Sequence, residues 1–300
     1  MKRNLILIGT LVLIAAIWAL TFPLTKIAVL GGYRNFGIIF WSSTISVAVL
    51  GVFVRMRGLN LPINSAALVR YFFVALFGTV LPSAASYTAA EHLPAGVIAV
   101  CMPMIPLLSL PLAISLGLDS ATPGRLLGLA LGVSGVLMIT IPDASLPDGS
   151  QAVYVLLVLL AVLCYAIEGV GLGRIGRAGL DSVQLLLGAS VLSVIVALPI
   201  ALATGTIIIP VLPFSMAEYA VLLSGLANTV AYVGYVWMVG RGGAVFASQV
   251  AYLVTGFGVL WSMALLGESY SIWIWGAFIV IIAGLFLTQP KPKPTPAEVA

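Results

Sequence analysis

Polar and aromatic side chains recur at helical spacing inside long apolar runs of this 300-residue chain. Asn228, Tyr232 and Tyr235 follow one another at i, i+4 and i+7, so they would share one face of a helix. In the next run, Gln249 and Tyr252 share a face in the same way. Amides in such runs are unfavourable in lipid unless they face protein or a wet cavity. Rings and amides arranged like this could bind a small amphipathic solute by stacking and hydrogen bonding.

Two further pairs extend this pattern. Trp18 and Thr21 share a face near the N-terminus, and Tyr165 and Glu168 are neighbours on a central run. Any one stripe is more typical of helix packing than of a binding site. Together they predict a mostly neutral cavity near the centre of the spans. The candidate substrate-binding residues are Trp18, Tyr87, Met102, Tyr165, Glu168, Asn228, Tyr232, Tyr235, Gln249 and Tyr252.

Glu168 lies about a turn or more from the end of its apolar run, where a carboxylate is costly unless it faces protein or water. One interpretation is a cavity group that binds an amine or a proton. The other is a buried partner for Arg174 or a helix-end carboxylate at the interface. The sequence supports both.

The stretch "SYTAAEHLPAGVIAVCMPMIP" (86–106) places the single histidine of the chain beside a glutamate and then interrupts an apolar run with prolines. Pro103 and Pro106 remove backbone donors, and such breaks survive in lipid where neighbours or a wet cavity satisfy the freed carbonyls. The pattern predicts a kinked helix that lines the pathway, with a purely structural kink as the alternative.

Three charged or titratable residues near predicted span ends are candidates for gating. Glu91 and His92 form either a solvated loop pair or part of an outer mouth, where histidine would make a gate sensitive to pH. Lys26 either extends to the outer interface or belongs to an outer gate. The candidate gating or kink residues are therefore Pro103, Pro106, Lys26, Glu91 and His92.

Enzyme chemistry is poorly supported by the same sequence. His92 has no glycine-flanked serine to activate, and His, Cys and carboxylates do not cluster at metal-ligand spacing. "GLGRIG" (171–176) matches a dinucleotide-binding pattern, but it ends an apolar run rather than joining a strand to a helix. We expect no enzyme activity, no cofactor and no metal.

Composition sets the class of fold. Hydrophobic residues make up 62% of the chain and charged residues 7%, against about 25% charged residues in soluble proteins. Apolar runs recur at a length that spans a bilayer as helix. The chain is therefore predicted to be an all-α membrane protein with ten transmembrane helices, near 5–29, 36–54, 68–90, 94–117, 124–141, 152–173, 182–203, 216–238, 243–266 and 270–288.

Basic residues predict the orientation of these spans. Of the 13 Lys and Arg residues, all except Lys26 and Arg34 fall on one side, and basic residues near span ends stay in the cytoplasm. Both termini are predicted to be cytoplasmic, in a bacterial inner membrane. This asymmetry also accounts for the net charge of +4 without a nucleic-acid partner. The polar, proline-rich residues 290–300 are predicted to be a disordered tail.

The two halves of the chain show an internal repeat. A shift of 148 residues places Tyr87 on Tyr235 and Gly128 on Gly276 without gaps. The predicted repeats cover 1–143 and 150–289. Because each holds five spans, an odd number, the second must be inverted relative to the first. Inverted repeats are typical of secondary transporters, which hold substrate near the midplane between them.

Three segments resemble a known family: "WALTFPLTKIA" (18–28), "YTAAEHLPAGVIAVCMPMIPLLSL" (87–110) and "VFASQVAYLVTGFGVLWSMALLGES" (245–269). They are similar to the ten-span EamA-like exporters of the drug/metabolite transporter superfamily, and most similar to bacterial aromatic amino-acid exporters. One departure is "LGLDS" (116–120), which leaves Asp119 as a displaced counterpart of Glu268 in the "LGE" motif.

The resemblance implies an inner-membrane exporter of amino acids, aromatic ones among them, or of similar small metabolites, working by alternating access. Partners would be the substrate, the lipid bilayer and, through Glu168, protons. One alternative is a membrane sensor or scaffold that binds a ligand without moving it. Another is a carrier of a different metabolite class. Phosphorylated cargo would require several basic groups at mid-membrane, and only Lys26 and Arg174 come near.

Overall fold

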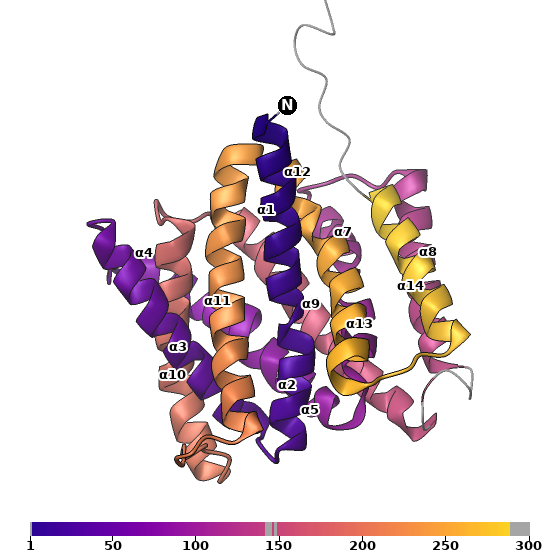
Figure 1. Cartoon of the computed structure of the whole chain (residues 1–300). Coiled ribbons are helices and arrows are strands. Elements are labelled where there is room, and N and C mark those ends of the chain that lie inside the picture. The colour runs from indigo at the N-terminus through magenta and orange to yellow at the C-terminus, as the bar shows by residue number, and fades with distance from the viewer. Residues whose placement is uncertain (1, 142–145, 147–148, 289–300) are drawn as a thin grey trace, which may run out of the picture.

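The computed structural model describes residues 2–141, 146 and 149–288, and throughout these residues the regular structure is helical, without strands (Figure 1). Nine helical stretches in this part of the chain have the length and hydropathy to cross a membrane, and Ile272–Thr288 is a shorter apolar helix. The all-α membrane fold with ten spanning segments is therefore confirmed. The predicted tail, 290–300, lies outside the described residues.

The first five spans are built from nine elements. They are α1 (Lys2–Ala19), α2 (Thr21–Leu30), α3 (Asn35–Met56), α4 (Ser65–Ala75), the π-helical η1 (Leu76–Val80), α5 (Leu81–His92), α6 (Ala95–Cys101), α7 (Met104–Ser115) and α8 (Pro123–Thr140). The first span joins α1 and α2, the third joins α4, η1 and α5, and the fourth joins α6 and α7.

The last five spans follow a short 3-10 turn, η2 (Gly149–Gln151). They are α9 (Ala152–Ile175), α10 (Ser182–Ala203), α11 (Met216–Gly242), α12 (Ala244–Ser248) with α13 (Val250–Leu266), and α14 (Ile272–Thr288). The start of α1 and the end of α14 lie at the same end of the bundle, which we call the terminal end; the α13–α14 loop lies at the opposite end (Figure 1).

Three spans are interrupted by a short break between two helices. The first breaks at Leu20, because Pro23 cannot donate to the Ala19 carbonyl four residues earlier. The fourth breaks at Met102 and Pro103, between α6 and α7. The ninth breaks at Gln249, between α12 and α13.

Helices of the two halves pack against one another rather than forming separate bodies. α1 packs on α11 and α13, α3 on α10, α5 on α9 and α8 on α14. Glycines allow the last of these contacts, since a Cβ on Gly128 would lie 2.6 Å from the Gly284 carbonyl oxygen. This pairing brings residues far apart in the sequence to a common interior.

Candidate functional site

The contact between α1 and α11 unites three of the predicted binding residues. The Trp18 indole Nε1 donates a hydrogen bond to Asn228 Oδ1 at 3.0 Å. The same indole meets the Tyr235 ring edge to face, with centroids 6.0 Å apart at an interplanar angle of 62°. An amide, an indole and a phenol therefore form one group within the apolar bundle.

A second group forms where α5 packs on α9. Tyr87 and Tyr165 both interact with the Ser83 side chain, and Tyr165 also interacts electrostatically with Glu168. Tyr232 on α11 interacts electrostatically with both Glu168 and Tyr235, so it connects the two groups. We call the seven residues of both groups the central cluster: Trp18, Tyr87, Tyr165, Glu168, Asn228, Tyr232 and Tyr235.

Glu168 lies against the π-helical turn of the third span. A Cβ on Gly78 would come within 3.2 Å of Glu168 Cγ and 3.4 Å of Cδ, so the glycine provides the room that the carboxylate occupies. The half-buried Glu168 carboxylate makes no hydrogen bond or ion pair to any other described residue. Its electrostatic partner on the terminal side is Arg177. The alternative of a pairing with Arg174 corresponds to no ion pair among the described residues.

The face that α9 turns toward the bundle is sealed at one end and open at the other. Val155, Val158 and Val162, in the half away from the termini, are all 0% exposed. Gly169 follows on the same face, eleven residues after Val158, yet it is exposed and an added Cβ would meet no atom within 4 Å. The bundle is therefore closely packed at the far end of α9 and open nearer its terminal end.

α11 shows a similar change along its length. Val221, Ser224 and Ala231 lie on its buried face. Asn228 lies between them on that face and is nevertheless exposed. The Trp18–Asn228–Tyr235 group therefore borders an accessible space on the interior side of α11.

Two serines near the cluster were not predicted. Ser42 Oγ and Ser86 Oγ are buried and make no hydrogen bond of normal geometry within the described part of the chain. Ser42 lies beside α11, with its Cα 3.3 Å from a Cβ built on Gly225, and Ser86 precedes Tyr87 on α5. Ser42 still lies within reach of the Tyr87 hydroxyl. The buried Ser86 hydroxyl, which has no partner among the described residues, points to water or a ligand nearby. Serine is too common in helices to have marked these positions in the sequence.

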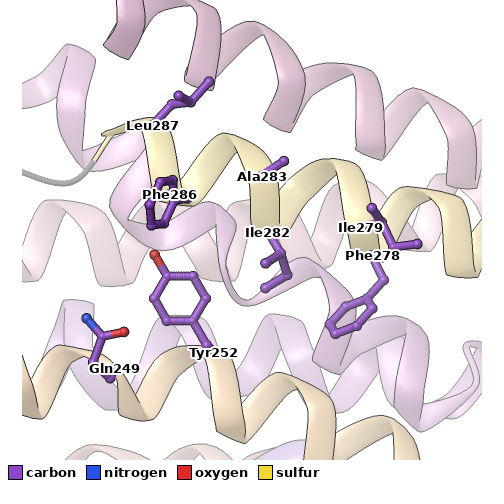
Figure 2. A pocket seen from close by; sticks show the side chains of 8 residues that line it. All are labelled: Gln249, Tyr252, Phe278, Ile279, Ile282, Ala283, Phe286 and Leu287. Carbon is purple, nitrogen blue, oxygen red and sulfur yellow. The ribbon is translucent and has the colours of Figure 1, made fainter.

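Gln249 and Tyr252 lie apart from the central cluster. They line a groove of about 680 Å³ between α13 and α14, and Figure 2 shows the Tyr252 hydroxyl directed toward Phe286. The other wall is apolar and belongs to α14: Phe278, Ile279, Ile282, Ala283, Phe286 and Leu287. Seven of the ten candidates thus belong to the central cluster, whereas Gln249, Tyr252 and Met102 do not.

The predicted kink residues lie at and beyond the break in the fourth span. Met102 occupies the break and is half-buried, and Pro103 precedes the first residue of α7 and is buried. Pro106 lies within α7 and is exposed. The break thus falls at Pro103, while the helix continues through Pro106.

The predicted gating residues lie at the far end. Lys26 Nζ donates to the carbonyl oxygens of Ala90 at 2.7 Å and Leu93 at 3.0 Å, so its ammonium turns to the protein instead of the interface. Glu91 forms an ion pair with Arg34. His92 is exposed and stacks on Tyr154, with ring centroids 3.8 Å apart.

Glu268 and its displaced counterpart have different partners. The Glu268 carboxylate accepts hydrogen bonds from the backbone N–H groups of Ala95, at 2.7 Å, and Gly96, at 3.1 Å. Asp119 instead binds Arg125, with Arg125 Nη2 donating to Oδ2 at 2.7 Å. That hydrogen bond, together with the Ser120 backbone N–H, holds the pKa of Asp119 below its usual range.

Within the part of the chain that the structure describes, no group of three or more His, Cys, Asp or Glu side chains is placed to hold a metal ion. The central cluster has one carboxylate, a set of rings and several hydroxyls. Such an arrangement can bind an amine, a ring and hydrogen-bonding groups.

A helical bundle of membrane-spanning length, with polar and aromatic groups at the junction of two five-span halves, defines a multi-pass membrane protein. The EamA-like transporter family matches residues 5–141 and again 152–289. The chain belongs to this family and is a membrane transporter of the drug/metabolite type, built from a tandem repeat.

One solved structure, titled "Crystal structure of protein", shares the fold with a TM-score of 0.59 at 18% sequence identity. The similarity covers 96% of this chain and 97% of that one. No curated protein matches the sequence significantly.

Proposed function

We propose that this transporter exports amino acids, aromatic ones among them, or similar small metabolites across a bacterial inner membrane by alternating access. The observation that carries the proposal is the central cluster, in which Trp18, Asn228 and Tyr235 meet beside an accessible space. Indole and phenol rings favour an aromatic or apolar side chain, and the amide and hydroxyls favour a polar backbone group.

Glu168 supplies a negative charge that could pair with the ammonium group of such a substrate. It is the one charged member of the central cluster, and its carboxylate has no described hydrogen-bond partner. A carboxylate in an apolar bundle is stabilised by a cation, so it would bind a substrate ammonium or a proton. The seven cluster residues include no basic side chain, and Arg177 is the basic residue that acts on them electrostatically. Phosphorylated cargo needs several basic groups, so it is disfavoured.

The openness of the bundle on one side supports alternating access. The asymmetry of basic residues supports cytoplasmic termini, and with that orientation the terminal end is the inner end. The open Gly169 and sealed Val158 on one face of α9 then correspond to a transporter that is accessible from inside and closed outside. In repeat-based transporters, one repeat rocks against the other around a fixed central site.

Flux in proteoliposomes tests the proposal. Vesicles with purified protein are loaded with labelled phenylalanine, tyrosine, leucine, glutamate or a sugar phosphate, and efflux is compared with empty vesicles. We expect efflux of neutral aromatic or aliphatic amino acids above background, and none of the sugar phosphate. A ligand sensor would bind an amino acid without flux, and export of the sugar phosphate alone would replace the proposed substrate class.

A further inference from the structure

The break between α5 and α6 leaves backbone groups that helices normally pair. Pro94 has no N–H, and the chain turns there, so the Ala95 and Gly96 amides start a helix without intrahelical acceptors. The Ala90 and Leu93 carbonyls end the preceding helix. Because this region is buried, groups left unpaired here would be costly.

Glu268 pairs with the start of α6 from the other half of the chain. Its Oε1 accepts from Ala95 N at 2.7 Å and its Oε2 from Gly96 N at 3.1 Å. The Tyr270 hydroxyl donates to the same carboxylate. Tyr270 also fills the space beside Gly96, where a Cβ would lie 2.1 Å from the phenol oxygen. A side chain at residue 96 would therefore displace Tyr270.

Lys26 pairs with the other side of the break. Its ammonium donates to Ala90 O and Leu93 O and is attracted electrostatically by Glu268. The carboxylate at the start of α6 and the ammonium at the end of α5 also match the helix dipoles. Three side chains from α2 and the α13–α14 loop thus satisfy both ends of one chain break.

The short helix held in this way belongs to the seal at the outer end. All seven residues of α6 are buried, and its Val97 and Val100 share a core cluster with Val155 and Val158 of α9. On its other side, α6 packs on α13, where a Cβ on Gly258 would lie 2.7 Å from the Ala99 Cβ. Moving α6 would therefore open the outer end.

At the inner end, the described residues give Asp119 different partners from those of Glu268. The displaced counterpart Asp119 binds Arg125 on its own hairpin, and Arg125 Nε donates to Thr288 O at 3.2 Å. In the described part of the chain, Asp119 makes no hydrogen bond to α12, the helix that starts the ninth span. The outer end therefore has a contact that holds α6, and among the described residues Asp119 makes no such contact at the inner end. This difference agrees with the exposure along α9, where Val158 is buried and Gly169 is exposed.

We propose that Lys26, Glu268 and Tyr270 form an outer lock, which holds α6 in the sealing position and must open when substrate leaves to the outside. These are positioning residues, which act through α6 and do not touch substrate. The inference rests on the proposed function in one respect: a lock that opens implies a second, outward-accessible state.

Two cysteine reporters test the lock without any substrate. Cys101 ends α6 and is 0% exposed, so in a Cys164→Ala background it reports release of α6 to a membrane-impermeant maleimide added outside. Gly169→Cys, in a background with Cys101 and Cys164 both replaced by Ala, reports access from inside. Gly169 accepts this change because its Cβ would meet open space. Right-side-out and inside-out vesicles provide the two sides.

Glu268→Gln is the main variant, because the Gln amide keeps the size but turns an N–H₂ group toward a backbone donor. Loss of one charged hydrogen bond shifts an equilibrium by about tenfold. We expect outside labelling of Cys101 to rise by about that factor, while inside labelling at residue 169 falls. Tyr270→Phe keeps the packing on Gly96 and serves if Glu268→Gln does not fold; it should shift both reporters in the same directions by less. Ser269→Ala, on the same loop and exposed, should shift neither.

Opposite changes at the two reporters support the lock. A rise at both reporters would mean loosened packing, and parental labelling at both would mean no coupling; either result overturns it. Failure of the proposed function is distinguishable, because the parent would then show no amino-acid flux whatever the labelling. If the parent transports amino acids but Glu268→Gln and Tyr270→Phe are labelled at the same rates as the parent, the lock is contradicted and the proposed function is not.

Discussion

Trp18 donates its indole N–H to the side-chain oxygen of Asn228 at 3.0 Å, across 210 residues of sequence. This contact joins the first span to the eighth at the point where the buried face of α11 becomes accessible. In an apolar bundle this hydrogen bond fixes the orientation of the Trp18 indole. Because the Tyr235 ring packs against that indole, the orientation of Tyr235 is fixed as well. A substrate would meet both rings.

Trp18→Phe should weaken substrate binding about three- to tenfold, since it removes the hydrogen bond to Asn228 but keeps an aromatic ring beside Tyr235. The measurement is the substrate concentration at half-maximal flux. Trp41→Phe is the matched control, because Trp41 Nε1 donates to the Ile208 carbonyl at 2.9 Å, outside the central cluster. Equal weakening in the two variants would contradict a binding role for Trp18.

Glu168→Gln should abolish the response of transport to an imposed pH gradient, because the amide has the shape of the acid but cannot take up a proton. Counterflow of unlabelled against labelled substrate should continue at equal pH. Asp119→Asn removes a carboxylate outside the cluster and should keep the parental response. If the gradient alters transport equally in parent and Glu168→Gln, the carboxylate is not the coupling group.

Gly78→Ala should reduce transport, because the added methyl group comes within 3.2 Å of Glu168 Cγ and 3.4 Å of Val74 Cγ1. Overpacking of this kind costs about 1–3 kcal/mol. Gly51→Ala in α3 is the matched control, since its methyl group meets nothing within 4 Å and alanine is the better helix former. Thermal unfolding in detergent should show a lower midpoint for the first variant and an equal or higher one for the second. Unchanged flux in Gly78→Ala would show that the position of Glu168 is not critical.

The Asp119–Arg125 contact should give a small, pH-dependent contribution to stability. Because the folded pKa of Asp119 is depressed, this contribution is present above the unfolded pKa of about 3.9 and is lost as the pH falls through the folded pKa. Both groups are partly exposed, so the contribution is about 1 kcal/mol or less. Asp119→Asn should lower the unfolding midpoint slightly at pH 7, and the difference should shrink as the pH falls below about 4. A difference that grows on acidification would contradict this assignment.

The spans were predictable from the sequence because the signal is local. An apolar run of bilayer length forms a helix whatever its neighbours, and turn residues separate the runs. The break at Pro103 is local in the same sense, since proline removes a donor from its own helix. The π-helical turn at Gly78 has no comparable local signal in the sequence. The absence of a side chain there leaves space for Glu168, which belongs to another span.

The candidate site shows the limit of helical spacing. Spacing indicates which residues share a face of one helix, and it correctly groups Asn228 with Tyr235. It does not indicate which helix that face meets. Gln249 and Tyr252 share a face as expected, but the face turns to α14 rather than to the central cluster. The hydrogen bonds that Glu268 accepts from the Ala95 and Gly96 N–H groups also depend on how distant helices pack, which helical spacing does not indicate.

The account depends on the central cluster being the place where substrate binds. The most direct test is an experimental structure of the protein with a transported aromatic amino acid bound. We predict density for the substrate ring beside Trp18 and Tyr235, with its ammonium toward Glu168. Substrate density confined to the groove between α13 and α14, with an empty central cluster, would contradict the account.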